Sequence, residues 1–318
     1  MDTRESRQSF QIVLAIAALL TTAAVLTLRT VEHPLVFQPT SDNPTPLGYT
    51  WSLLLFLIPI GALAWWFASR PDLKFPRAAF WRTIVVLVPL GFLLDLLFGN
   101  AFFLFPNKAA TLGIDIPARD GSIPIEEFVF YVAGFMLVLL SYIWCDEYWM
   151  AAYNVPDYES AAKGIPRIVG FHFASVILGL GLIGGAVVYR KLFSGAPAGF
   201  PGYFIYLTCV SLIPSAGFFK TAQSFINWRA FSFTFFLLLL ISLLWEVTLA
   251  LPYAWWLYRD DAMIGLRIGA WSNLPIEAPC VWMAVTFTTV IVYEAIKIWK
   301  ALGRRAVSAF FGNNRDQT

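Results

Sequence analysis

The chain contains 318 residues, of which 58% are hydrophobic and 13% are charged, and its formal net charge is +2. Soluble domains carry about 25% charged residues, so this composition excludes a soluble globular protein and indicates an integral membrane protein. The small net charge argues against nucleic-acid binding. With two histidines and three widely spaced cysteines, the sequence predicts neither a metal site nor a cofactor.

Apolar runs long enough to span a bilayer, which takes about 17–25 residues, recur along the whole chain. We therefore expect an all-α polytopic membrane protein. The eight predicted spans are 10–28, 50–69, 79–100, 124–146, 166–190, 199–217, 229–251 and 275–299.

Acidic residues in and beside these apolar runs reveal an internal repeat. The separation of Asp95 from Glu126 equals that of Glu246 from Glu277, and both second acids follow Pro-Ile. A single offset of 151 residues relates the two pairs and maps the first four spans onto the last four. Because four is an even number, the two four-helix units should run in the same direction. The predicted repeats are residues 1–150 and 151–318.

Lysines and arginines are distributed unevenly between the predicted loops. Fifteen lie on the side of the two termini, and seven lie on the opposite side. Since cytoplasmic loops of membrane proteins carry the excess of positive charge, both termini are predicted to be cytoplasmic. We expect the protein to reside in the inner membrane of a bacterial cell.

The longest loops within the repeats, 101–123 and 252–274, lie on the side opposite the termini. Each combines aromatic with charged residues, which is typical of interfacial or re-entrant structure. The four acids of the repeat also approach this side of the membrane. Because a charge that faces lipid is costly, we expect these acids to point inward, toward a cavity that the two loops cap.

Carboxyl groups at such a place have two competing interpretations. A carboxyl group removed from water beside another carboxylate favours its neutral form and can donate a proton, and its conjugate base can accept one. Alternatively, Pro-x-Glu is an ordinary helix start, where the helix dipole favours negative charge. The repetition favours the functional interpretation. Glu127 follows Glu126 but points about 100° away on a helix, and its repeat counterpart is Ala278.

The segment Ser122-Ile-Pro-Ile-Glu-Glu-Phe-Val-Phe-Tyr131 resembles the Pro-x-Glu-Glu-Phe-x-Phe signature of the small membrane lycopene cyclases. These are the heterodimeric bacterial enzymes and their fused archaeal and fungal relatives. The resemblance implies cyclisation of the ends of a carotenoid such as lycopene, without net redox change. Glu126 and Glu127 match the motif directly, and Glu277 matches it through the repeat, so the resemblance implies that these glutamates are catalytic.

In the implied mechanism an acid protonates a terminal alkene, a nearby double bond attacks the resulting cation, and a base removes a proton. We expect Asp95 and Glu246 to hold or relay the proton. Aromatic faces attract a cation, although interfacial anchoring explains aromatic residues equally well. The predicted partners are a long apolar polyene and the lipid bilayer. The predicted substrate-binding residues are Phe128, Phe130, Tyr131, Tyr253 and Trp255.

Three alternatives stay open at this point. A proton-coupled membrane transporter also fits parallel repeats with matched acids, and its acids should lie near the membrane midplane. A cyclase of another membrane terpenoid would use the same chemistry. A membrane scaffold protein would use the acids only to cap helices.

The last predicted span carries one further charged pair. Glu294 and Lys297 are three residues apart and therefore lie on one face of a helix. This spacing predicts a local ion pair.

Overall fold

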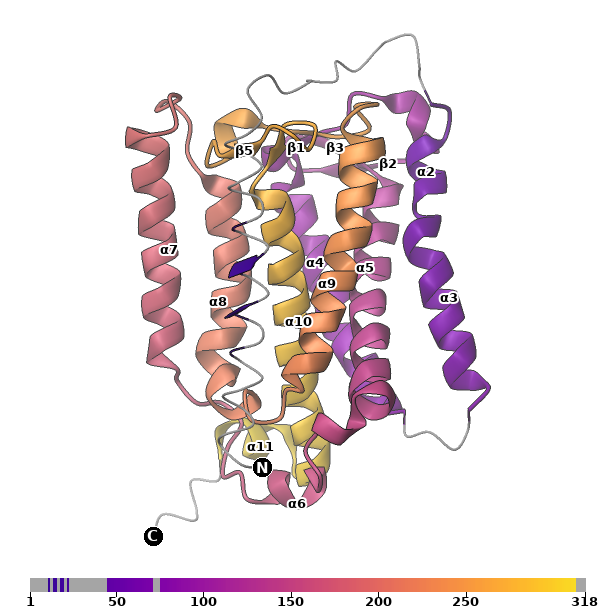
Figure 1. Cartoon of the computed structure of the whole chain (residues 1–318), viewed down its shortest axis with the longest axis vertical. Helices are drawn as coiled ribbons and strands as arrows, with labels where there is room; N and C mark the ends of the chain where they lie inside the picture. Colours follow the sequence, from indigo (N-terminus) through magenta and orange to yellow (C-terminus); the bar gives the residue numbers. More distant parts are fainter. Residues whose placement is uncertain are drawn as a thin grey trace.

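The computed structural model describes residues 45–70 and 75–312, together with helical residues 11, 14, 15, 18, 19 and 22. Figure 1 shows long helices standing side by side, with short strands at one end of the bundle. Seven helices in the described part of the chain are long and apolar enough to cross a membrane. The predicted all-α membrane fold is therefore confirmed. The first predicted span, 10–28, lies mostly outside the described residues.

The long helices match the remaining predicted spans, with ends that shift by a few residues. Single-turn π-helices at Cys145–Trp149 and Glu246–Ala250 extend α5 and α9. Two short helices, α6 (Tyr158–Lys163) and α11 (Ala306–Phe311), lie at the end of the bundle opposite the strands (Figure 1). The helices in the bundle are α2 (Gly48–Ser52), α3 (Leu54–Ala68), α4 (Arg77–Phe102), α5 (Ile125–Trp144), α7 (Phe173–Leu192), α8 (Gly202–Ala222), α9 (Trp228–Trp245) and α10 (Glu277–Leu302).

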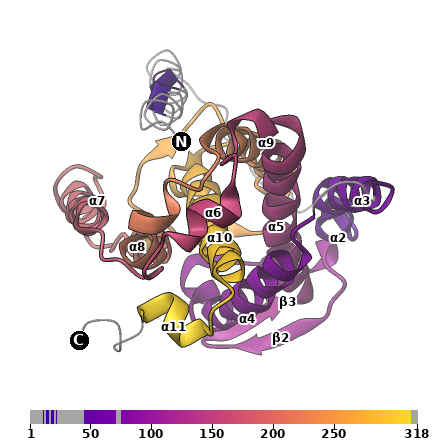
Figure 2. The same cartoon turned by 90° about the horizontal axis from the view of Figure 1, so that it is seen from below.

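Helices α3, α4 and α5 correspond to α8, α9 and α10. Helix α4 begins at Arg77 and α9 begins at Trp228, which is the same offset as that between the acids. Each helix runs in the same direction as its counterpart (Figure 1), as the sequence predicts for parallel repeats. Helix α7 stands at the edge of the bundle and packs against α8 (Figure 2).

Helices α5 and α10 meet along the axis that relates the two halves. The rings of Tyr142 and Tyr293, which are equivalent positions of the repeat, lie 5.9 Å from each other. Asp146 and Lys297, also equivalent positions, form an ion pair of 3.1 Å. Two equivalent positions of a repeat can contact each other only where the axis that relates the two halves passes between them. Helix α10 accordingly lies near the middle of the bundle in Figure 2, among α4, α5, α8 and α9.

The two long loops form strand pairs that cover one end of the bundle, which we call the hairpin face. The pair β1–β4 joins the two halves, and its register sets Phe103 opposite Tyr258. Within each half a hairpin precedes the helix of the Pro-Ile-Glu motif. The strands are β1 (Phe103–Leu104), β2 (Asp115–Ala118), β3 (Gly121–Pro124), β4 (Leu257–Tyr258), β5 (Arg267–Ile268) and β6 (Leu274–Pro275).

The long loops also show the repeat, because each contains an ion pair at equivalent positions. The acidic and the basic residue have exchanged positions between the two halves. Lys108 binds Asp115 at 2.9 Å in the first half, and Asp260 binds Arg267 in the second. The offset between these two pairs exceeds the offset between the helices by a single residue. The long loops thus have a common structure, although their sequences do not show it.

Candidate active site

A cavity lies beneath the hairpin face, between the two halves. Its volume is about 80 Å³. A single water needs roughly 10–15 Å³, so the cavity is several times larger than one water. It lies on the repeat axis, because three pairs of its lining residues are equivalent in the two halves: Phe130 and Val281, Tyr131 and Trp282, Gly134 and Val285. The remaining lining residues are Phe103, Glu127, Phe135, Tyr203, Trp245, Glu246, Trp256 and Tyr258.

Two carboxyl groups line this otherwise apolar cavity. Glu127, in the first turn of α5, accepts a hydrogen bond of 2.5 Å from the hydroxyl of Tyr49. Glu246, at the start of the π-helical turn after α9, is 4% exposed. It accepts hydrogen bonds from Tyr258 at 2.6 Å and from Ser242 at 3.1 Å. Two acids from non-equivalent positions of the repeat therefore share one cavity.

The hairpin face positions the hydroxyl that binds Glu246. Tyr258 is held by the β1–β4 pairing opposite Phe103, and the two rings lie 5.3 Å apart. Burial, and next the negative charge of Glu246, raise the pKa of Tyr258 well above its ordinary value. The phenol therefore keeps its proton and acts as a hydrogen-bond donor. The predicted capping of a cavity by the long loops is confirmed, since Phe103, Trp256 and Tyr258 all come from them.

The matched acids of the two Pro-Ile-Glu motifs lie outside the lining of this cavity. Glu126 accepts hydrogen bonds from the backbone N–H of Leu112 at 2.7 Å and from the Thr50 hydroxyl at 2.5 Å. Glu277 accepts one of 2.5 Å from the N–H of Ile264. The two N–H groups are equivalent in the repeat, so each glutamate ties its hairpin to the start of its helix. This geometry matches the helix-start interpretation of the motif.

Glu277 also differs from Glu126 in its electrostatic surroundings. Burial lowers the pKa of Arg267, and the negative charge of Glu277 opposes that effect. Arg190, at the end of α7, is buried with 4% of its surface exposed, and its charge also acts on Arg267. The second motif therefore has two arginines near it, although neither Glu277 nor Glu126 belongs to an ion pair among the described residues.

Asp95 lies behind the cavity wall. It is 4% exposed, and the Tyr131 hydroxyl donates a long hydrogen bond of 3.4 Å to it. Two glycines of α4 make room for this pair. A Cβ atom at Gly99 would lie 2.8 Å from the Asp95 carboxyl, and one at Gly91 would lie 2.9 Å from the ring of Tyr131. Asp95 is therefore linked through Tyr131 to the cavity, whose lining it does not join.

The predicted substrate-binding residues divide between the cavity and its surroundings. Phe130 and Tyr131 line the cavity. Phe128 is buried against Phe92, with ring centroids 4.9 Å apart. Tyr253 and Trp255 lie in the loop above and stack on each other, with centroids 6.3 Å apart. The lining residues Tyr203, Trp245, Tyr258 and Trp282 come from the second half and were not among the predicted substrate-binding residues, because the motif is incomplete in that half.

Aromatic rings form a continuous wall along one side of the cavity. Trp245 contacts Phe130 at 4.9 Å, Trp256 at 4.5 Å and Phe56 at 5.0 Å between ring centroids. Ser52 accepts a 2.7 Å hydrogen bond from the Trp245 indole and so fixes that ring. Such a wall offers π-faces and excludes water, which suits a hydrocarbon that becomes transiently cationic.

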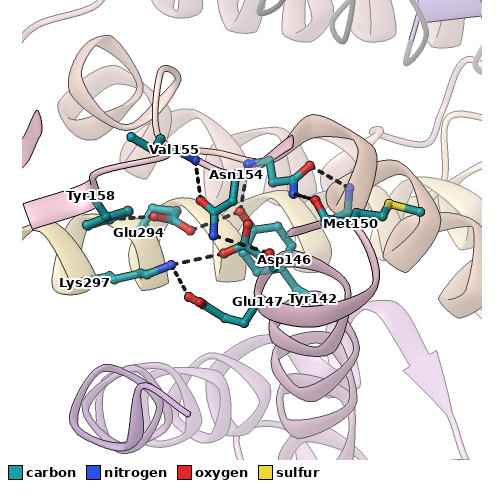
Figure 3. A network of polar contacts seen from close by, with 11 residues as sticks. Tyr142, Asp146, Glu147, Met150, Asn154, Val155, Tyr158, Glu294 and Lys297 are labelled. Atoms are coloured by element: carbon teal, nitrogen blue, oxygen red, sulfur yellow. Dashed lines mark hydrogen bonds and ion pairs between the residues drawn. The ribbon is translucent and has the colours of Figure 1, made fainter. Parts of the chain in front are cut away.

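A second group of buried acids lies at the opposite ends of α5 and α10 (Figure 3). Lys297 binds Asp146 at 3.1 Å and Glu147 at 2.7 Å. Glu294 is fully buried and accepts hydrogen bonds from Tyr142 at 3.0 Å and from Tyr158 at 2.8 Å. The predicted local ion pair of Glu294 with Lys297 is therefore wrong, because the lysine reaches across the repeat axis to α5.

The fold and the site define a class: a polytopic membrane protein with an apolar, acid-containing cavity between two internal repeats. Comparison with family models gives a match to the lycopene cyclase family over residues 46–145 and 202–296. The chain belongs to the lycopene cyclase family, and this membership supports carotenoid cyclisation as its general activity. The two matched segments correspond to the three-helix units α3–α5 and α8–α10, except for the last turns of α10. Comparisons with curated proteins and with solved structures gave no match.

Proposed function

We propose that this protein cyclises the acyclic ends of a lycopene-like polyene, without redox chemistry, in the cavity beneath the hairpin face. The observation that carries the proposal is the presence of two carboxyl groups, Glu127 and Glu246, in one aromatic-lined cavity. Ring closure needs one group that gives a proton and another that takes one. Two glutamates that share an apolar cavity can supply both groups, one as a carboxylic acid and the other as a carboxylate.

The proposed reaction keeps atoms and charge in balance. A carboxylic acid transfers its proton to the terminal double bond of the polyene, which leaves a tertiary cation. The electrons of a nearby double bond attack that cation, form the ring and move the positive charge to a ring carbon. A carboxylate then removes a proton from a neighbouring carbon, which sets the ring alkene. No electron acceptor or donor takes part.

The aromatic wall would lower the energy of both cations. A cation over an aromatic face gains about 0.5–1 kcal/mol when exposed and about 2 kcal/mol or more when water is excluded. Phe130, Trp245 and Trp282 line the cavity, and Phe56 stacks behind Trp282 with centroids 5.8 Å apart. Water exclusion would also protect each cation from capture as an alcohol.

Expression in cells that accumulate lycopene tests this proposal. We expect cyclic pigments with wild-type protein, and acyclic pigment with the double variant Glu127→Gln, Glu246→Gln at the same protein level. Glu159→Gln, which changes an exposed acid of α6, is the matched control and should behave as wild type. Pigment that stays acyclic with abundant, folded wild-type protein would contradict the proposal and favour another membrane terpenoid as substrate.

A proton-coupled transporter is less consistent with this arrangement. Its acids should lie near the membrane midplane and open alternately to both sides. Glu127 instead lies in the first turn of α5 and Glu246 follows the end of α9, both next to the hairpin face. By the distribution of positive charge, we propose that the hairpin face lies on the side of the membrane away from the cytoplasm.

A further inference from the structure

We propose that Glu127 is the acid that protonates the polyene and that Glu246 is the carboxylate that removes the proton from the ring cation. This assignment rests on the proposed function and gives each carboxyl group of the cavity a single role. The two groups differ in three ways that bear on these roles: their hydrogen-bond donors, their charged neighbours and their counterparts in the repeat.

The first difference is the number of hydrogen-bond donors. Each oxygen of Glu246 accepts a hydrogen bond from a hydroxyl, one from Tyr258 at 2.6 Å and the other from Ser242 at 3.1 Å. Donors directed at a carboxyl group favour its ionised form. Glu127 accepts one such hydrogen bond, from Tyr49, on a single oxygen. Glu246 is therefore better prepared to exist as a carboxylate before substrate arrives.

The second difference is the charge around each group. Glu127 directly follows another acid, Glu126, whereas the chain neighbours of Glu246 are uncharged. None of the ion pairs among the described residues includes Glu127. Neighbouring carboxylates disfavour ionisation, since like charges repel. Glu127 is accordingly the group that keeps its proton, and one neutral acid beside one carboxylate leaves a single negative charge between them.

The third difference comes from the repeat. The counterpart of Glu127 is Ala278, and the counterpart of Glu246 is Asp95, which lies behind Tyr131 and does not line the cavity. The fold is two-fold symmetric, but its acids are not, so the cavity contains one donor and one acceptor. Each molecule would cyclise one end of a polyene at a time, and a substrate with two reactive ends would have to turn around between turnovers.

The assignment makes Tyr258 and Ser242 positioning residues that act through Glu246. In each turnover Glu127 loses a proton to the substrate, and Glu246 gains a proton from the ring cation. The cavity then holds the same number of protons as before, so the proton must pass from Glu246 back to Glu127 before the next turnover. No proton need be drawn from either side of the membrane.

Single variants distinguish the two roles. We use purified protein in detergent, with lycopene as substrate in heavy water, and analyse pigments by chromatography and mass spectrometry. Glu127→Gln should consume no substrate and should add no deuterium to it, with a loss of about 10²–10⁴-fold. Glu246→Gln should still protonate the polyene, because Glu127 is intact. It should therefore give deuterium in recovered lycopene, and shifted ring-alkene isomers or a water adduct.

Variants of the positioning groups give a graded test that does not remove a carboxyl group. Tyr258→Phe should slow ring formation about tenfold or more, since it removes a hydrogen bond to a charged group, and should shift the product in the same direction as Glu246→Gln. Tyr148→Phe, a change at an exposed position of the π-helical turn after α5, is the control and should leave the rate unchanged. A monodisperse elution profile checks that each variant is folded.

The outcomes separate the assignment from the proposed function. Deuterium exchange with Glu127→Gln and none with Glu246→Gln would reverse the two roles while leaving the cyclase function intact. Loss of all exchange in both folded variants, or normal products from Glu246→Gln, would also overturn the assignment. Failure of wild-type protein to form rings would instead contradict the proposed function itself.

Discussion

Buried and half-buried acids lie at both ends of the helix bundle, and the two ends differ in what surrounds those acids. At the end opposite the hairpin face, Lys297 forms ion pairs with Asp146 and Glu147, and two tyrosine hydroxyls donate hydrogen bonds to the two carboxyl oxygens of Glu294 (Figure 3). At the hairpin face, Glu127 and Glu246 have hydroxyl donors and, within the described part of the chain, no ion-pair partner, and they face a cavity.

This difference shows how buried acids with structural roles are separated from those with chemical roles. A buried charge is stable when a charge of opposite sign and several hydrogen bonds compensate it. An acid that must exchange a proton with a ligand needs open space next to it and no permanent counter-ion. Burial alone does not separate the two classes, since Glu294 and Glu246 are both almost fully buried.

The largest effect on stability should come from removing the cation of the network in Figure 3. Lys297→Met leaves the fully buried Asp146 without its ion-pair partner, and loss of one partner of a buried pair costs about 3–5 kcal/mol. Unfolding in mild detergent measures the change in free energy. Lys300→Met, on an exposed position of the same helix, should change it by about 0.5 kcal/mol or less. Equal stability of the two variants would remove the distinction between the two ends.

A smaller effect should follow from neutralising Glu294. Burial, and next the charge of Glu294, raise the pKa of Tyr158 well above its ordinary value, so this phenol is a permanent donor. In Glu294→Gln the amide nitrogen cannot accept a hydrogen bond, so either Tyr142 or Tyr158 loses its acceptor. We expect a destabilisation of about 1–3 kcal/mol, with ring formation per folded molecule unchanged.

The same unfolding assay, combined with pigment analysis, checks this prediction. Glu159→Gln, at an exposed site on α6, is the control for the loss of one negative charge. If Glu294→Gln abolished ring formation in folded protein, the network would take part in the chemistry, and the separation between the two ends would be wrong.

The sequence was sufficient for the features that depend on local pattern. The length of the apolar runs predicted the seven described spans, and the offset between Asp95 and Glu246 predicted the equivalence of the helices. The composition of 101–123 and 252–274 predicted that the long loops cap a cavity. These features can be inferred because hydrophobicity and spacing act within one helix or between two copies of it.

The features that failed to follow from the sequence depend on contacts between distant segments. The repeated motif favoured Glu126 and Glu277 as the catalytic acids. In the structure these two residues tie the hairpins to α5 and α10, and Glu127 lines the cavity instead. Spacing gave the angle between Glu126 and Glu127 but not which of them faces inward. For Lys297, its short spacing from Glu294 favoured the wrong partner. Its equivalence to Asp146 in the repeat was the overlooked signal, because equivalent residues on central helices meet at the axis.

The smallest predicted effect concerns the space that distinguishes the hairpin end. Gly134 is buried and lines the cavity, yet a Cβ atom there would meet no atom within 4 Å. Gly134→Ala should therefore place a methyl group in the cavity itself. Replacing a helical glycine by alanine favours the helix by about 0.8–1 kcal/mol, so the variant should be no less stable than wild type while ring formation slows a few-fold.

Gly181→Ala is the control that separates the effect on helix stability from the effect on the cavity. Gly181 is also a helical glycine with no atom within 4 Å of a Cβ position. It lies on α7, which stands at the edge of the bundle (Figure 2) and contributes no residue to the cavity lining. The two variants should gain similar stability, and only Gly134→Ala should slow ring formation. Equal rates for both would mean that the substrate end does not occupy the space beside Gly134. The cavity would then not explain why the acids at the hairpin face have a chemical role and the acids around Lys297 have a structural one.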